Sequence, residues 1–184
     1  MKLSSQLMDQ VNVEQLSPMM RQYVEMKRAH QDQLLFYRLG DFYEMFFDDA
    51  VLVSRELELT LTGRDCGLPE RAPMCGVPYH SVDTYIARLI KKGYKVAICE
   101  QLENPALAKG MVKRDIIRVV TPGTLIESDI LDEGSNNFIC SICCGENGCG
   151  LSFCDISTGE MNVTQLEGKD QGMVINELGK FRPN

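Results

Sequence analysis

An aromatic ring and a carboxylate stand two positions apart in the segment Gly40–Ala50, at Phe42 and Glu44. Such a pair can probe a stacked base, since a ring can wedge between base steps and a carboxylate can accept a hydrogen bond from a base N–H. The same residues also fit a structural interpretation. Asp41 can cap a helix that has Glu44 at its third position, and Phe42 lies four residues before Phe46, as core side chains on a helix do. Spacing alone favours the structural interpretation.

The elements around this segment predict a mixed α/β fold, in which helices flank a mixed sheet. The apolar run Leu34–Leu39 is typical of a central strand. Gly40 ends that strand, and an apolar stripe then predicts a helix to about Glu58. The Gly- and Pro-rich stretch Gly63–Pro78 is expected to be a long loop. The other elements expected in this part are helices at about 17–30 and 81–93 and strands at 59–62, 94–99 and 116–120.

The remaining residues predict a second, incomplete domain. Three strands are expected at about 138–144, 150–156 and 160–166, joined by short Gly-containing turns, with a helix at about 169–180. Three strands and one helix make a thin core, so we expect a chain cut inside this domain. The predicted organisation is a flexible arm at 1–16, a first domain at 17–121, a linker at 122–137 and a truncated domain at 138–184.

The net charge of −7 is unevenly distributed along the chain. Residues 1–121 hold 16 basic and 16 acidic residues, whereas residues 122–184 hold 3 and 10. The first part is therefore free to carry local basic patches, although the whole chain is acidic. The apolar runs are too short to cross a bilayer, and the N-terminus lacks a secretory signal. We expect a cytoplasmic protein without membrane contact.

Five of the eight cysteines cluster, which raises the question of a metal site. They are Cys140, Cys143, Cys144, Cys149 and Cys154. The C-x2-C pair formed by Cys140 and Cys143 lies in a predicted strand, where side chains three apart point to opposite faces. No second C-x2-C follows. We therefore predict buried structural cysteines and no metal site.

Four segments together resemble one family. Gly40–Ala50 resembles the mismatch-reading motif of the MutS family of bacterial DNA mismatch-repair proteins. The segments Pro73–His80, Val96–Gln101 and Arg118–Thr124 agree with the same family in order and spacing, and together the segments extend over most of residues 17–124. The tail resembles the opening of the family's connector domain, whose core is ribonuclease-H-like.

This resemblance implies a DNA-binding module without catalysis. Members of the family are large dimeric ATPases that bind duplex DNA with mispairs or small loops and act with a MutL-type partner. The sequence contains no G-x-x-x-x-G-K-[ST] motif. We therefore expect no cofactor here, because ATP and magnesium belong to an ATPase domain that these residues do not include.

The resemblance assigns mismatch recognition to Phe42 and Glu44. The ring is expected to wedge into the duplex and the carboxylate to discriminate between bases. We predict further DNA contacts from Arg64, Met74, Lys109, Lys113 and Arg114. Four other aromatic residues are assigned to the core, and Asp48 and Asp49 to a solvated helix face. The four are Phe36, Tyr37, Phe46 and Phe47.

Two rival functions concern the second part of the chain. Asp155 lies in a predicted strand similar to the acidic strand of ribonuclease-H-like nucleases. Two-metal hydrolysis needs several converging carboxylates, and the tail shows no obvious companions for Asp155. Alternatively, the acidic residues 122–184 form a docking surface for another protein, which is compatible with DNA reading by the first part.

Overall fold

The computed structural model describes residues 11–103, 108, 110–124, 136–168 and 170–184. The chain divides into two compact units, Met1–Val120 and Thr121–Asn184. Lys109 and most of the predicted linker lie outside the described residues. The first unit contains η1 (Val13–Gln15), α2 (Pro18–Ala29), β1 (Leu34–Leu39), β2 (Phe42–Phe46), α3 (Phe47–Leu57), β3 (Thr62–Arg64), β4 (Ala72–Pro78), η2 (Tyr79–Ser81), α4 (Val82–Lys91), β5 (Val96–Gln101) and β6 (Arg114–Val120).

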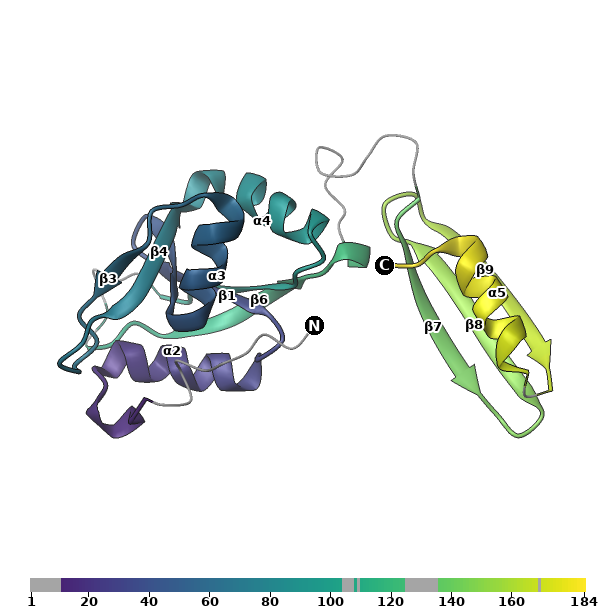
Figure 1. Cartoon of the computed structure of the whole chain (residues 1–184), viewed down its shortest axis with the longest axis horizontal. Coiled ribbons are helices and arrows are strands. Elements are labelled where there is room, and N and C mark those ends of the chain that lie inside the picture. The colour runs from purple at the N-terminus through teal and green to yellow at the C-terminus, as the bar shows by residue number, and fades with distance from the viewer. Residues whose placement is uncertain (1–10, 104–107, 109, 125–135, 169) are drawn as a thin grey trace. The chain divides into compact units, whose positions relative to one another are not determined.

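Six strands of the first unit form one mixed sheet in the order β3-β4-β2-β1-β5-β6. β1 pairs with β5 in parallel, and every other neighbouring pair is antiparallel. Helix α2 covers one face of the sheet, while α3 and α4 cover the other (Figure 1). The predicted mixed α/β class is confirmed. Leu16, ahead of α2, is only 3% exposed, so the folded unit begins before residue 17.

The predicted helix from Gly40 to Glu58 is wrong over its first part. Gly40 and Asp41 form a two-residue hairpin connection, and Gly40 has the left-handed φ of +56° that such a connection requires. The chain then returns as β2, so α3 begins only at Phe47 and Asp41 caps no helix. Residues four apart share a face on a strand as well as on a helix, so the spacing of Phe42 and Phe46 did not distinguish the two.

The predicted loop from Gly63 to Pro78 is also wrong for much of its length. Only residues 65–71 connect β3 to β4, and Ala72–Pro78 is a strand paired on both sides. Pro78 lies at the end of β4, where the missing N–H of proline is tolerated. The predicted strand at 59–62 instead begins at Thr62. The helices expected at 17–30 and 81–93 and the strands at 94–99 and 116–120 are confirmed as α2, α4, β5 and β6.

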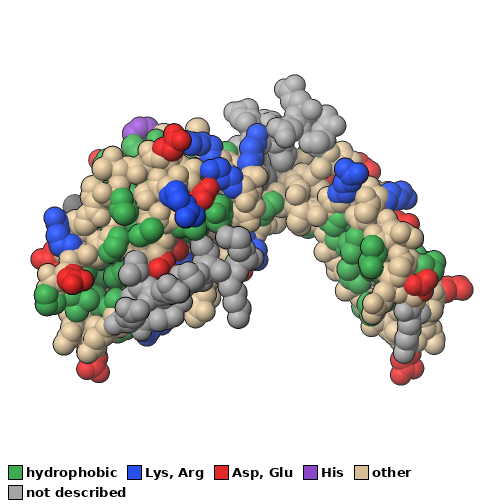
Figure 2. Space-filling model, viewed as in Figure 1, with side chains coloured by type: hydrophobic (Ala, Val, Ile, Leu, Met, Phe, Trp, Pro, Cys, Tyr) green, Lys and Arg blue, Asp and Glu red, His purple; other side chains and the backbone are tan. Residues whose placement is uncertain are grey.

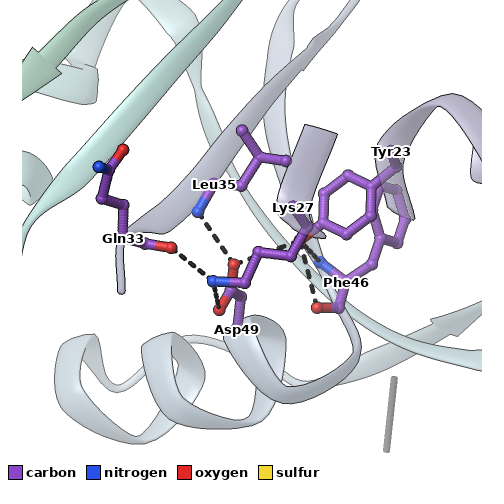
Figure 3. Close-up of polar contacts among 6 residues, drawn as sticks. All are labelled: Tyr23, Lys27, Gln33, Leu35, Phe46 and Asp49. Atoms are coloured by element: carbon purple, nitrogen blue, oxygen red, sulfur yellow. Dashed lines mark hydrogen bonds and ion pairs between the residues drawn. The ribbon is translucent and has the colours of Figure 1, made fainter. Parts of the chain in front are cut away.

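A buried ion pair connects α2 to α3, where a solvated helix face was expected. Asp49 is only 2% exposed, and its Oδ1 lies 2.9 Å from Lys27 Nζ. Asp49 Oδ2 accepts a hydrogen bond from the backbone N–H of Leu35 at 2.9 Å (Figure 3). The assignment of Asp49 to a solvated face is therefore wrong. The helical pattern could not show that Lys27 lies opposite.

The hydroxyl of Tyr23 extends this network to the end of β2. It accepts a hydrogen bond from the backbone N–H of Phe46 at 3.2 Å and lies 3.4 Å from Asp49 Oδ2 (Figure 3). The Tyr23 ring also packs edge-on against the Phe46 ring, with centroids 4.9 Å apart. Phe46 and the three other aromatic residues assigned to the core are at most 4% exposed, which confirms that assignment. The network fixes the end of the strand that carries Phe42 and Glu44.

The second unit contains the three antiparallel strands and the helix predicted for it. They are β7 (Phe138–Cys144), β8 (Gly148–Asp155), β9 (Glu160–Glu167) and α5 (Gln171–Phe181), and the short helix η3 (Pro122–Thr124) precedes them. The sheet order is β7-β8-β9, and Phe181 of α5 stacks on Phe153 with ring centroids 4.1 Å apart. The prediction of buried cysteines in the cluster is wrong for Cys143 and Cys144, which are exposed. The other clustered cysteines are partly buried, whereas Cys66, Cys75 and Cys99, outside the cluster, are buried.

Asp155 organises the turn after β8. Its Oδ1 accepts hydrogen bonds from the N–H and the hydroxyl of Ser157, at 2.9 and 2.6 Å, and its Oδ2 accepts one from Asn137 N–H at 2.8 Å. These hydrogen bonds, that of the Ser157 side chain first, lower the pKa of the carboxyl group. Both oxygens of a buried carboxylate are thus occupied by protein donors. This arrangement favours a structural role for Asp155 over metal binding.

Replacement of Asp155 by Asn should destabilise the second unit by about 1–3 kcal/mol, because an amide group would face backbone N–H donors. Folding lowers the pKa of Asp155, so its contribution is present above the unfolded-state pKa of about 3.9 and is lost as the pH falls through the folded-state pKa. Amide hydrogen exchange of β8, corrected for intrinsic rates, measures both effects. Asp170→Asn, which keeps an N-cap acceptor in the same unit, is the control and should change little. Equal protection of β8 in the two variants would contradict the structural role.

Candidate nucleic-acid interface

Strand β2 places Phe42 and Glu44 on one face of the sheet and Tyr43 and Met45 on the other. Tyr43 and Met45 are 5% and 0% exposed, whereas Phe42 is 47% exposed. Phe42 follows the hairpin turn directly and pairs in register with Leu39 on one side and Pro78 on the other. Phe42 is therefore not a core residue, and the structural interpretation of its spacing is wrong. An exposed phenyl ring at a hairpin end is free to contact another molecule.

Glu44 forms an ion pair with Arg64. Arg64 Nη1 donates to Glu44 Oε2 at 2.5 Å, and the side chains of Glu44 and Arg64 are 15% and 38% exposed. The two residues come from different strands, β2 and β3, and β4 lies between them. The carboxylate predicted to read a base and the guanidinium predicted to contact a phosphate are thus partners in the free protein. Sequence separation concealed this pairing.

Gly76 has no side chain and therefore leaves space beside Glu44. It lies opposite Glu44 in the β2–β4 register. A Cβ at this position would stand 3.3 Å from Tyr43 O and 3.4 Å from Glu44 Cγ, closer than most such contacts. A glycine inside a strand often marks a place where another backbone or a ligand approaches closely. Any larger residue here would crowd the Glu44 side chain.

An aromatic and ionic cluster on the opposite face of the sheet holds the hairpin, and the sequence reasoning missed it. The Arg38 guanidinium carbon lies 3.8 Å from the Tyr79 ring centroid, and Arg38 pairs with Glu100 at 3.5 Å. The Tyr43 hydroxyl donates to Glu100. Burial, followed by this carboxylate, raises the pKa of Tyr43 to about 12. Tyr79 N–H also donates to Asp41 O at 2.9 Å, so this cluster fixes the turn before Phe42.

The other predicted contacts differ in their surroundings. Met74 is half-buried in β4, opposite Phe46 and against the core, and does not lie in a loop. Arg114 is 8% exposed, stacks over the Tyr37 ring at 5.0 Å and donates to Arg38 O at 2.9 Å. These contacts favour a structural role for Arg114. Lys113 is exposed, and Lys109 lies outside the described residues.

Basic side chains lie beside acidic ones on the face of the first unit that Figure 2 shows, rather than in one uniform basic stripe. This agrees with the equal numbers of basic and acidic residues in the first part of the chain.

In the described part of the chain, no three His, Cys, Asp or Glu side chains gather in a way that could hold a metal ion. No described helix is long and apolar enough to cross a membrane.

Comparison with known proteins assigns the family. The model of MutS domain I matches residues 17–129. The chain is 59% identical over 168 residues to the DNA mismatch repair protein MutS of Clostridium botulinum strain Hall, which covers 91% of this chain and 18% of that protein. It is 59% identical over 170 residues to the DNA mismatch repair protein MutS of Acetivibrio thermocellus, which covers 92% of this chain and 20% of that protein. The chain thus spans about a fifth of the length of these relatives. The match to MutS domain I extends over more than half of the chain and shows that the chain belongs to the MutS family.

Proposed function

We propose that the first unit reads mispaired or unpaired bases in duplex DNA through Phe42 and Glu44. The observation that carries the proposal is the 47% exposure of Phe42 at the end of a hairpin, with Glu44 two residues further on the same face. A single exposed apolar side chain is common on protein surfaces, so the exposure of Phe42 permits contact with a partner without identifying one. Family membership makes DNA the partner to test.

Phe42 acts as a wedge in this proposal. A phenyl ring pushed between two base steps unstacks them and kinks the duplex. Unstacking costs a few kcal/mol and costs less where the bases are already mispaired. Insertion therefore favours a mispair over a matched pair without any code for the individual bases. The anchored turn before Phe42 and the buried network after Phe46 hold the strand rigid. Contact with the ring therefore deforms the DNA and not the protein.

Glu44 discriminates, and Arg64 modulates that discrimination. Matched base pairs present mostly hydrogen-bond acceptors in the minor groove, which a carboxylate cannot satisfy. A displaced base that offers an N–H can donate a hydrogen bond to the Glu44 carboxylate. In the free protein the Arg64 guanidinium offsets the charge of this carboxylate at 2.5 Å. The approach of phosphates gives Arg64 a competing anion, which leaves Glu44 available to the base.

The remaining activities belong to the longer proteins of the family. We propose that the chain acts as part of a dimeric mismatch-repair ATPase in the bacterial cytoplasm, together with a MutL-type partner. In this proposal the 184 residues bind DNA without catalysis, since they contain no P-loop motif. Nucleotide and magnesium would bind downstream, in residues of the longer protein.

The proposal is tested by titrating the chain with two duplexes that differ by a single mispair. Fluorescence anisotropy at low and at moderate salt measures both dissociation constants, because phosphate contacts weaken steeply with salt. The proposal predicts tighter binding of the mispaired duplex at both salt concentrations. Equal affinity for the two duplexes would overturn it.

Replacement of Glu44 by Gln should tighten binding to the matched duplex on the order of 1 kcal/mol, or about fivefold in Kd. The reason is that the variant keeps the shape of the side chain and removes its charge. The preference for the mispaired duplex should shrink accordingly. The matched control is Glu56→Gln on α3, which also removes an ion-paired carboxylate from the first unit and should leave both affinities unchanged. An equal fall in both affinities for Glu44→Gln would rule out the discriminating role.

A further inference from the structure

Two cysteines face one another where β7 and β8 join in the second unit. Cys144 is the last residue of β7 and Cys149 the second residue of β8, and they are paired in the strand register. The Cys149 thiol donates a hydrogen bond to Cys144 Sγ at 2.7 Å. The DNA-reading role proposed for the first unit makes no use of either residue.

The backbone around this pair is suited to a bond between the two sulfur atoms. Gly145 N–H donates to Gly148 O at 2.8 Å, so Gly145 and Gly148 form a hydrogen-bonded pair of the hairpin. Pairs alternate along antiparallel strands, so the next one, Cys144 with Cys149, is a non-hydrogen-bonded pair. The Cα atoms of such pairs lie about 4.5 Å apart, within the range found for disulfides.

No other cysteine of these two strands has a thiol opposite it. Cys143 is exposed, but its register partner is Gly150, which has no side chain. The partners of Cys140 and Cys154 are Phe153 and Ile139. Among the described register pairs of β7 and β8, Cys144 and Cys149 are therefore the only two thiols brought face to face.

We propose that Cys144 and Cys149 form a reversible dithiol–disulfide pair that is oxidised by hydrogen peroxide. Cys144, the exposed member, attacks the peroxide as its thiolate. The O–O bond breaks, a sulfenic acid forms on Cys144, and the leaving hydroxide takes up the thiol proton as water. Cys149 sulfur then attacks Cys144 sulfur, the S–O bond breaks, and a second water leaves with the Cys149 proton. Two thiols and one peroxide thus give one disulfide and two waters, and an added thiol reverses the change by exchange.

The roles of the two thiols follow from their surroundings. Cys149 is half-buried beside Leu166 and other core residues, so a peroxide meets Cys144 first. The hydrogen bond to Cys144 and partial burial raise the pKa of the Cys149 thiol. Cys149 lies close enough to Cys144 to resolve the sulfenic acid with little movement of the hairpin.

The test treats the whole chain with a small excess of hydrogen peroxide and maps its peptides by mass spectrometry. The expected result is a mass lower by about 2 Da, a disulfide between Cys144 and Cys149 and a loss of two of the eight alkylatable thiols, all restored by a thiol reductant. Cys144→Ser should abolish the disulfide, whereas Cys143→Ser, the adjacent exposed cysteine, should retain it. Cys149→Ser should leave a sulfenic acid on Cys144 that a dimedone probe captures.

Several results would overturn the proposal. The first is a disulfide that joins two chains, and the second is a disulfide that forms equally in Cys144→Ser. The third is oxidation of Cys144 in the wild type to a sulfinic acid without a disulfide. The fourth is that all eight thiols can still be alkylated after the peroxide treatment. Far-UV circular dichroism shows whether each variant keeps the fold. DNA titration is not a readout here, so failure of this proposal and failure of the mismatch-reading proposal are distinguishable.

Discussion

Replacement of Phe42 by Ala should weaken binding to a mispaired duplex about 10- to 100-fold and abolish the preference over matched DNA. Removing a stacking aromatic side chain costs about 1–3 kcal/mol per base. The loss falls mainly on the mispaired complex, because only a mispair lets the ring insert at low unstacking cost. Anisotropy titrations of the same two duplexes measure the effect.

The fold should survive this replacement. Phe42 is 47% exposed, and substitutions of exposed side chains usually change stability by no more than about 0.5 kcal/mol. Val51→Ala is the matched control, since Val51 is also a large exposed apolar side chain, at 41%, but lies on α3. It should bind both duplexes like the wild type. If Phe42→Ala keeps its preference for the mispair, or if Val51→Ala loses it, the wedge assignment fails.

Replacement of Lys27 by Met should destabilise the first unit by about 3–5 kcal/mol at neutral pH, because it leaves Asp49 buried without a counter-charge. Urea unfolding followed by far-UV circular dichroism measures this loss. Lys95→Met is the matched control. It also breaks a lysine–aspartate pair at 2.9 Å, but the partners, Lys95 and Asp32, are 48% and 55% exposed. Exposed pairs contribute at most about 1 kcal/mol, so this variant should remain near the wild-type stability.

The loss in Lys27→Met should shrink as the pH falls. Burial raises the pKa of Asp49, and Lys27 is the main influence that lowers it. Without Lys27, the folded protein takes up a proton at Asp49 at higher pH than the unfolded chain does. Its stability therefore rises as the pH falls through the folded-state pKa toward the unfolded-state value of about 3.9. A penalty that stays constant between pH 7 and 5 would show that lost packing, rather than an uncompensated charge, causes it.

This network also bears on the proposed function. Asp49, Lys27 and Tyr23 fix the backbone of Phe46, at the end of the strand that carries the two reading residues. Phe47, the next residue, has a left-handed φ of +53°, which is rare for a bulky side chain. The junction of β2 and α3 thus adopts one conformation because buried contacts on three elements require it. Loss of those contacts should loosen β2 before it affects the distant strands.

Patterns within about ten residues predicted most elements correctly. The apolar run Leu34–Leu39 is β1, the helix expected at 81–93 is α4, and the three strands expected in the tail are β7 to β9. The shortness of the run, the apolar spacing of the helix and the Gly-containing turns of the tail identified these elements. The prediction for Phe42–Phe46 was wrong because a spacing of four residues fits a strand as well as a helix. The Gly and Pro content of Pro73–Pro78 concealed a paired strand.

The sequence by itself determined the fold class, the elements with an unambiguous period and, through four segments, the family. Only the tertiary structure decided that Phe42 is exposed, that Glu44 is paired with Arg64, that Asp49 is buried against Lys27 and that Cys144 faces Cys149. The physical reason is that a side chain's partner depends on strand register and helix packing. Those are set by contacts summed over the whole unit, whereas the period of a strand or a helix is already present in a few neighbouring residues.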